Sequence, residues 1–405
     1  MEKNKTRIKD FVESIVDNRG RNPDKYYDQE AVPVIDNFMI KNTLHPDLTA
    51  AERFLNEEQY KTFLRGYIEE DDVLVTLVGG IGNVTLAPKA RAAIVQNTIG
   101  LKTNKKIINN HFFYYYLCTI NQSIKNLDRG VSQPSVNRKD FLKLKIDIPK
   151  LEYQHKVAKI LRNYDQIIEN NNKRIKILEQ MAENLYKEWF VRFRFPGYEN
   201  TEFENGIPKE WTYFKFSDLY KCERGISYST EEIEVEEGEN LINLKNIQSF
   251  GGFRRDGLKK YNGKYREQQK VSYNDLVMGV TDMTQDRRTV GAVALIPKIN
   301  GVISADLVKL TSKINNVFSY CLFRFGFYSK LFSQFGNGAN VIHLKPSSIK
   351  NQKILIPTQK LVDLFVKNVE ALIEKIENLN LVNDNLAKQR DALLPRLMSG
   401  KLEIK

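Results

Sequence analysis

Several residue types and patterns that proteins often depend on are scarce in this 405-residue chain. Its three cysteines, Cys118, Cys222 and Cys321, stand alone, so we expect no disulfide framework and a reduced, cytoplasmic setting. No stretch approaches 18 consecutive apolar residues, and the first residues, Met-Glu-Lys-Asn-Lys, lack an apolar signal segment. The sequence therefore predicts neither a membrane span nor secretion.

Catalytic signatures are also missing. The four histidines, His45, His111, His155 and His343, are far apart and have no metal-ligand spacing with the cysteines. Residues 80–82, Gly-Ile-Gly, lack the third glycine of a dinucleotide loop and lead into a strand pattern, which favours a hairpin turn. We therefore expect no catalytic residue, no bound cofactor and no metal site, and we do not expect this chain to be an enzyme.

Acidic residues are outnumbered by basic ones. The chain has 62 Lys and Arg against 50 Asp and Glu, a net charge of +12 and a pI near 9.2. This balance favours a polyanionic partner such as nucleic acid, although basicity alone is weak evidence. Hydrophobic residues at 41% suffice for sizeable cores, and the length predicts two or more domains.

One long helix organises the chain. Residues 151–190 contain no glycine or proline, and Pro196-Gly197 provides the stop. Apolar residues recur there at steps of four and three, the seam of a heptad repeat. The seam positions are Val157, Leu161, Tyr164, Ile168, Asn171, Ile175, Leu178, Ala182, Leu185 and Trp189.

The same pattern returns near the end of the chain. Its positions are Phe365, Val369, Leu372, Ile376, Leu379, Asn383, Leu386, Arg390, Leu393 and Leu397. Neither seam can bury its face alone, so we expect the two helices to pair. The alternative is that two unrelated amphipathic helices each lie on their own domain.

The two seam asparagines favour antiparallel pairing. If Val157 faces Leu397, paired residue numbers add to 554, and Asn171 then lies opposite Asn383. Each side-chain amide would satisfy the other, and such a buried polar pair fixes register. Parallel pairing would leave both amides among apolar residues.

The chain also repeats itself on a longer scale. Residues 72–74 match residues 275–277, and residues 82–89 match residues 291–298 with five identities in eight. Further matches in the same order are Arg19-Gly20 with Arg224-Gly225, Gly130 with Gly338, and Pro149 with Pro357. Strand-like runs dominate each copy, and Asn109-Asn110 suits the N-cap of an aromatic helix near residues 112–117.

We therefore predict an α+β chain with two β-rich domains related by an internal repeat and separated by two long helices forming an antiparallel coiled coil. The first domain covers residues 1–149 and a central spacer helix covers residues 150–195. A linker at 196–209 leads to the second domain at 210–357, and a C-terminal spacer helix covers 358–405. The loops differ between the copies, as expected for two readers of different targets and equally for neutral drift.

The strongest nucleic-acid signal lies in residues 253–270, where aromatic residues are interleaved among the cations. Its candidates for DNA contact are Arg254, Arg255, Lys259, Lys260, Lys264 and Arg266. Cations neutralise phosphates, and Arg, Asn and Gln can contact base edges. The alternative is an ordinary solvated basic surface.

Three polar loops supply further candidates. They are Arg129, Ser132, Gln133, Asn137, Arg138 and Lys139 in copy one, Gln285, Arg287 and Arg288 in an inserted loop, and Asn340, His343 and Lys345 in copy two. Glycine-rich polar loops are common on any surface, so the alternative of a plain surface loop stays open.

Three segments resemble one known family. Residues 130–137, Gly-Val-Ser-Gln-Pro-Ser-Val-Asn, resemble the Gly-x-x-Gln-Pro-x-Ile-Asn segment of the specificity (S) subunits of type I restriction–modification systems. Residues 151–154, Leu-Glu-Tyr-Gln, resemble that family's junction into its helix, and residues 206–211 resemble its entry into a second recognition domain. Copy two departs from the pattern, with Val341-Ile342 in place of Gln133-Pro134.

The resemblance implies a sequence-specific DNA-binding subunit whose two target-recognition domains each read one half of a bipartite site in double-stranded DNA. It implies two modification (methyltransferase) subunits, which carry S-adenosylmethionine, and restriction (endonuclease/translocase) subunits as partners. Two rivals are a non-specific DNA clamp or decoy, and the specificity part of a fused methyltransferase–endonuclease. The fused enzyme would need a cofactor motif that these residues lack.

Overall fold

The computed structural model describes residues 3–21, 23–27, 31–130 and 133–402. The chain divides into two compact units. Unit 1 consists of Met1–Asn171 and Val382–Lys405, and unit 2 consists of Asn172–Leu381. No helix within the described ranges has the length and apolar character needed to cross a bilayer.

Unit 1 is built on a four-stranded antiparallel sheet with the order β2 (Val12–Val16), β7 (Thr98–Thr103), β5 (Val73–Thr76) and β6 (Val84–Leu86). Side chains alternate across a strand. Val73 and Val75 therefore join the core beneath helix α2 (Asn110–Thr119), while Leu74 joins a second core on the other face. The central strand β5 is buried on both faces, as its continuous apolar run predicts.

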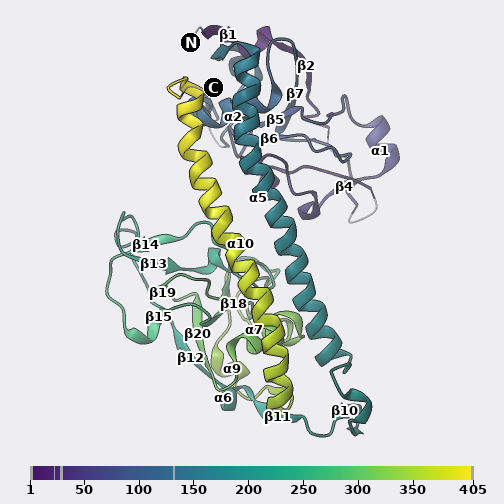
Figure 1. Cartoon of the computed structure of the whole chain (residues 1–405), viewed down its shortest axis with the longest axis vertical. Coiled ribbons are helices and arrows are strands. Elements are labelled where there is room, and N and C mark those ends of the chain that lie inside the picture. The colour runs from purple at the N-terminus through teal and green to yellow at the C-terminus, as the bar shows by residue number, and fades with distance from the viewer. Residues whose placement is uncertain (1–2, 22, 28–30, 131–132, 403–405) are drawn as a thin grey trace. The chain divides into compact units, whose positions relative to one another are not determined.

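Unit 2 repeats this plan. Its sheet has the order β12 (Tyr220–Arg224), β20 (Leu307–Ser312), β16 (Leu276–Gly279) and β18 (Val293–Leu295), again entirely antiparallel. Helix α7 (Asn316–Phe325) lies beside β18, and both are labelled in Figure 1. The predicted internal repeat is thus confirmed at the level of strand order.

The aromatic segment of each copy forms a helix that an asparagine caps. Asn109 Oδ1 accepts a hydrogen bond from the backbone N–H of Phe112 at 3.0 Å, which begins α2. Asn315 Oδ1 accepts from the N–H of Val317 at 2.7 Å at the start of α7. The hydrogen bond of Asn109 confirms the expected N-cap. An asparagine suits this position because its side chain pairs with a helix N–H that would otherwise have no partner.

Other elements complete the two units. In unit 1 they are β1 (Lys3–Arg7), β3 (Val32–Pro33), β4 (Phe54–Leu55), α1 (Glu57–Thr62), α3 (Asn121–Lys125), α4 (Arg138–Lys143) and β8 (Lys145–Pro149). In unit 2 they are β9 (Phe203–Glu204), β10 (Ile207–Pro208), β11 (Thr212–Lys215), α6 (Phe216–Leu219), β13 (Glu239–Ile242), β14 (Lys259–Tyr261), β15 (Lys270–Val271), β17 (Thr281–Asp282), β19 (Gly301–Ile303), α8 (Tyr328–Ser333), β21 (Ile342–His343), α9 (Pro346–Ile349) and β22 (Lys353–Ile356). The pairs β1–β8 and β11–β22 close the two copies in the same way.

The two heptad seams form two long helices. Helix α5 spans Leu151–Tyr186 and ends in a π-helical turn, Lys187–Val191, while α10 spans Gln359–Ser399. Both long helices appear in Figure 1. Gly197, with φ of +87°, adopts the left-handed conformation that follows the end of the first helix.

Within each unit the helices pair antiparallel, as predicted. In unit 1, Asn171 Nδ2 donates to Asn383 Oδ1 at 2.9 Å, and both residues are buried. In unit 2, the rings of Trp189 and Phe365 pack with centroids 5.7 Å apart. Both pairs have residue numbers that add to 554, the register expected from the sequence.

A buried carboxylate joins three helices of unit 1. Asp165 on α5 accepts hydrogen bonds from the Tyr115 hydroxyl of α2 and from the Arg390 guanidinium of α10. Asp165 is only 4% exposed. Burial raises the pKa of Asp165, although Arg390 and Tyr115 both oppose this by stabilising the charged form. This group of three residues is called the Asp165 clasp below.

Candidate nucleic-acid interface

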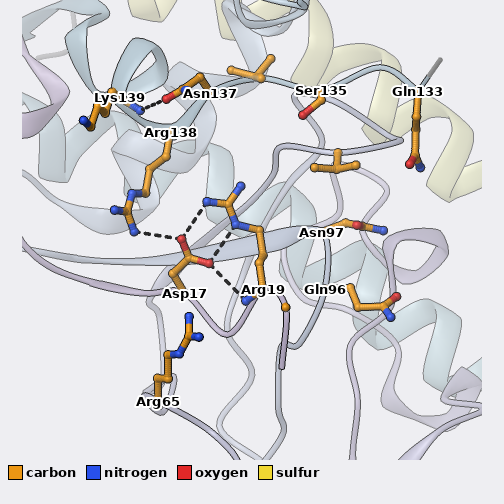
Figure 2. Close-up of a pocket in the computed structure, with 13 residues that line it drawn as sticks. Asp17, Arg19, Arg65, Gln96, Asn97, Gln133, Ser135, Asn137, Arg138 and Lys139 are labelled. Atoms are coloured by element: carbon orange, nitrogen blue, oxygen red, sulfur yellow. Dashed lines mark hydrogen bonds and ion pairs between the residues drawn. The ribbon is translucent and has the colours of Figure 1, made fainter. Parts of the chain in front are cut away.

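A polar cavity of about 930 Å³ opens on unit 1, and Figure 2 shows the residues around it. Segments far apart in the sequence contribute to it. The lining residues are Asp17, Arg19, Gly20, Arg65, Val78, Gln96, Asn97, Gln133, Ser135, Val136, Asn137, Arg138 and Lys139. One carboxylate faces four cations, so the cavity carries net positive charge.

Asp17 organises the cations on one side of this cavity. Arg19 donates to both Asp17 oxygens at 2.8 and 2.7 Å, and Arg138 Nη1 donates to Oδ2 at 2.9 Å. Burial alone raises the pKa of Asp17, but the hydrogen bonds and charges of Arg19 and Arg138 outweigh burial and lower it. The carboxylate therefore stays ionised and fixes two guanidinium groups at the rim.

Backbone hydrogen bonds hold the opposite side of the cavity. The N–H of Leu77 donates to the carbonyl of Asn97 at 2.8 Å, and the carbonyl of Leu77 accepts from the N–H of Val136 at 2.8 Å. The N–H of Gly79 also donates to the carbonyl of Pro134 at 3.0 Å. The two polar segments around Asn97 and Val136 are thus fixed to the same residue at the end of β5.

Gly130 lies against the backbone of Gln133. A Cβ atom at Gly130 would lie 1.9 Å from the carbonyl oxygen of Gln133, so no larger residue fits. In copy two, a Cβ atom added at Gly338 would likewise lie 1.8 Å from the carbonyl oxygen of Val341. The two matched glycines therefore have the same role: each lies so close to a backbone carbonyl that a side chain would not fit. The residue that carries the carbonyl differs between the copies.

Three amides beside the cavity are not engaged within the described part of the chain. The side chains of Gln96, Asn97 and Gln133 make no hydrogen bond there, and Figure 2 shows them on the side away from the Arg138–Asp17–Arg19 group. Arg65 is exposed at the edge of the cavity. An unengaged amide offers one donor and one acceptor to a base edge, and cations suit phosphates.

Sequence reasoning found part of this site. Gln133, Asn137, Arg138 and Lys139 all line the cavity. Arg129 lies outside it and reaches Asp140 at 3.4 Å. Ser132 lies outside the described residues.

Nine lining residues were not among the predicted contacts, and five of these nine have charged or amide side chains: Asp17, Arg19, Arg65, Gln96 and Asn97. They lie on elements that come together only through strand pairing. Strands β7 and β20 occupy the same place in the two copies. A comparison of the residues directly before these two strands would have pointed to residues 96 and 97.

The basic segment of copy two is only partly assembled into a groove. Lys264 and Arg266 line a groove of about 620 Å³ together with Arg224, Tyr265 and Gln269. The remaining cations of this segment lie elsewhere: Lys259 and Lys260 on β14, and Arg254 3.8 Å from Asp256. Only two cations of the predicted segment therefore line this groove.

Arg255 has a structural partner. Its Nη1 donates to both oxygens of Glu377 on α10 at 3.2 and 3.0 Å, and the backbone N–H of Lys298 donates to the same carboxylate at 2.9 Å. Glu377 is buried, so this ion pair fastens the basic segment to the helix. The structure thus gives Arg255 an internal role that the sequence did not indicate.

The inserted loop is also held internally. Arg287 Nη1 donates to the carbonyls of Ser333 and Gln334 at 3.3 and 3.4 Å, and Gln285 Nε2 donates to the carbonyl of Ala339 at 2.5 Å. Arg288 pairs with Asp286 at 2.9 Å.

The loop after α8 remains exposed. Asn340, His343 and Lys345 all have exposed side chains, and Lys345 precedes α9 as its N-cap residue. His343 also belongs to β21, which pairs with Thr281 of β17 beside the inserted loop. These three candidates therefore lie near the inserted loop rather than in the groove of Lys264 and Arg266.

Residues 1–180 match the family model described as the type I restriction modification DNA specificity domain. Over 373 residues the chain is 27% identical to the specificity subunit of the type I restriction enzyme MjaIX from Methanocaldococcus jannaschii, covering 88% of this chain and 83% of that protein. It is 22% identical to the specificity subunit of the type I restriction enzyme HindI from Haemophilus influenzae, covering 68% and 72%. Its fold is similar to the crystal structure of the S subunit of a type I restriction–modification system from M. genitalium, with a TM-score of 0.59, 14% identity and coverage of 100% and 97%.

Proposed function

Because this chain belongs to the family of type I restriction–modification specificity subunits, we propose that it reads a bipartite site in double-stranded DNA, one half-site with each copy of its repeated unit. It directs methyltransferase and restriction subunits to that site and carries no catalytic step itself. We assign the two target-recognition domains to residues 1–149 and 210–357 and the spacer helices to residues 150–195 and 358–405.

The cavity of unit 1 carries this proposal. It joins cations fixed by Asp17 with amides that have no partner among the described residues. Phosphate contacts position a protein on DNA, whereas base-edge contacts specify the sequence. The Asp17 group with Arg65 and Lys139 suits the first task, and the amide side suits the second.

The partners follow from the family and from the repeat. We propose that two modification subunits bind, because a repeated fold offers two similar surfaces to a partner present in two copies. S-adenosylmethionine belongs to those subunits, and the restriction subunits complete the assembly. We place the assembly in the cytoplasm, the setting that the three isolated cysteines favour.

The test uses the full chain assembled with its modification subunits and a library of random-sequence duplex DNA. Bound DNA is sequenced after several rounds of selection. We expect two enriched blocks separated by a gap of fixed length. Uniform recovery of all sequences would instead identify a non-specific clamp or decoy.

Removing one cation of the cavity should weaken DNA binding without changing which base sequence is selected. For Lys139→Ala we expect weaker binding to all sequences and a decrease of about one in the slope of log affinity against log salt. The enriched blocks should keep their sequence. Lys143→Ala, which removes an exposed lysine of α4 that does not line the cavity, provides the matched control.

A further inference from the structure

We propose that Asn97 and Asp306 occupy the same place in the two copies and set one base of each half-site, adenine for Asn97 and cytosine for Asp306. This inference rests on the proposed function. It identifies one specificity-determining position per copy, and it explains how a duplicated fold reads two different sequences.

Strand register establishes that the two positions correspond. Thr98 pairs with Thr76 between β7 and β5, and Leu307 pairs with Gly279 between β20 and β16. Since the two sheets have the same strand order, Thr98 and Leu307 are equivalent. Asn97 and Asp306 are the residues immediately before them.

The hydrogen bonds around the two positions agree. The N–H of Leu77 donates to the carbonyl of Asn97 at 2.8 Å, and the N–H of Val280 donates to the carbonyl of Asp306 at 2.9 Å. The carbonyl of Leu77 accepts from Val136, and the carbonyl of Val280 accepts from Leu344 at 2.8 Å. The same backbone frame therefore presents an amide in one copy and a carboxylate in the other.

Both side chains are available to a ligand. Asn97 lines the cavity of unit 1 and is half-buried. Asp306 is also half-buried, and within the described residues its carboxylate makes no hydrogen bond or ion pair. Arg224 Nε donates to the carbonyl of Ala305, the residue before Asp306, at 3.3 Å.

The chemistry of the two groups assigns their bases. An amide presents a donor and an acceptor together, which matches N7 and N6–H₂ of adenine in the major groove. A carboxylate only accepts, which matches the N4–H₂ donor of cytosine. The half-buried setting and the fixed backbone limit how far either group can turn, so each should discriminate strongly.

Reciprocal exchange tests the assignment, because Asn and Asp have nearly the same shape. The full subunit, assembled with its modification subunits, is prepared as Asn97→Asp and as Asp306→Asn. Each protein selects from the random duplex library. We expect Asn97→Asp to change one adenine of the first half-site to cytosine, and Asp306→Asn to change one cytosine of the second half-site to adenine.

Each exchange should alter the relative affinity for the two bases by about 5- to 150-fold at its own position. The other half-site should stay unchanged. Asn200→Asp, an exposed residue of the linker, makes the same change of charge away from both sites and should leave both blocks unchanged. Thermal unfolding checks that each variant is folded. Asn97→Ala provides a second test, in which the preference for adenine in the first half-site should be lost rather than changed to cytosine.

The outcomes separate this inference from the function it rests on. If the unaltered protein selects no sequence, the proposed function fails. If it selects two blocks but Asn97→Asp, Asn97→Ala and Asp306→Asn leave every base preference as it was, the function stands and the assignment of these positions is wrong. A uniform loss of affinity without a change of base would show that the two residues contact only the DNA backbone.

Discussion

The Asp165 clasp gives a quantitative prediction for Arg390→Met. Methionine keeps much of the apolar length of arginine but removes the charge that faces Asp165. Asp165 is 4% exposed, so its carboxylate would be left buried with only the Tyr115 hydroxyl as a partner. Breaking a buried ion pair from one side typically costs about 3–5 kcal/mol.

That cost is large for a single domain, whose free energy of unfolding is about 5–15 kcal/mol. For a unit of this size, 1 kcal/mol lowers the melting temperature by about 2–4 °C, so we expect a decrease of about 6–20 °C. Denaturant unfolding and calorimetry measure both quantities. Lys388→Met, on the exposed face of the same helix, should change stability by less than about 0.5 kcal/mol.

The effect should depend on pH in a defined direction. Burial raises the pKa of Asp165 above its usual 3.8 in the folded state, and loss of Arg390 raises that pKa further. The folded variant then binds a proton that the unfolded chain has released, so its stability falls as pH rises above about 4. The difference in unfolding free energy between Arg390→Met and the unaltered protein should therefore be largest at neutral pH and become smaller towards pH 3.

A double variant tests whether the unpaired charge of Asp165 causes the loss of stability. In Asp165→Asn/Arg390→Met the buried charge is absent, and we expect most of the lost stability to return. If Arg390→Met is as stable as the unaltered protein, the clasp contributes nothing. If the double variant is no more stable than Arg390→Met, the cost arises from packing rather than from charge.

Three further predictions concern other parts of the molecule. Burial alone lowers the pKa of His45, but the hydrogen bonds that its ring donates to the Asp71 and Glu169 carboxylates outweigh burial and raise the pKa to about 9. His45→Gln should therefore destabilise the protein below pH 6.5, and the difference in unfolding free energy should disappear as pH rises through 9. Arg255→Met should lower the stability of unit 2 by about 3–5 kcal/mol, because it leaves the buried Glu377 carboxylate uncompensated, and should leave the selected DNA sequence unchanged in the library assay. The purified chain alone should transfer no labelled methyl group from S-adenosylmethionine to DNA, and transfer above background would contradict a non-catalytic subunit.

Local and periodic features were predictable from the sequence. The register of α5 against α10 follows from heptad spacing, and the two asparagines, one in each seam, determine which alignment satisfies both. The aromatic helix followed from Asn109, because a cap acts within three residues. That the two sheets share one strand order was predictable, because the repeat places the same apolar runs in the same sequence order.

Non-local partners were not predictable. Gln96 and Asn97 approach residues 133–139 only because β5 pairs with β7 and its continuation binds the loop at Val136. Arg255 looked like a free cation because its partner Glu377 lies 122 residues away. A single sequence gives the type of each side chain, but it does not say which charges already have partners.

The backbone frame at Leu77 and Val280 has a consequence for how such proteins diversify. Both hydrogen bonds that position the neighbouring segments use main-chain atoms, so they form whatever side chain stands at residue 97 or 306. If residues 97 and 306 contact bases as proposed, a mutation at either position changes which base is contacted without removing any of these backbone hydrogen bonds. On this proposal, single substitutions that leave folding intact would give new targets, and each copy would acquire its own target independently of the other.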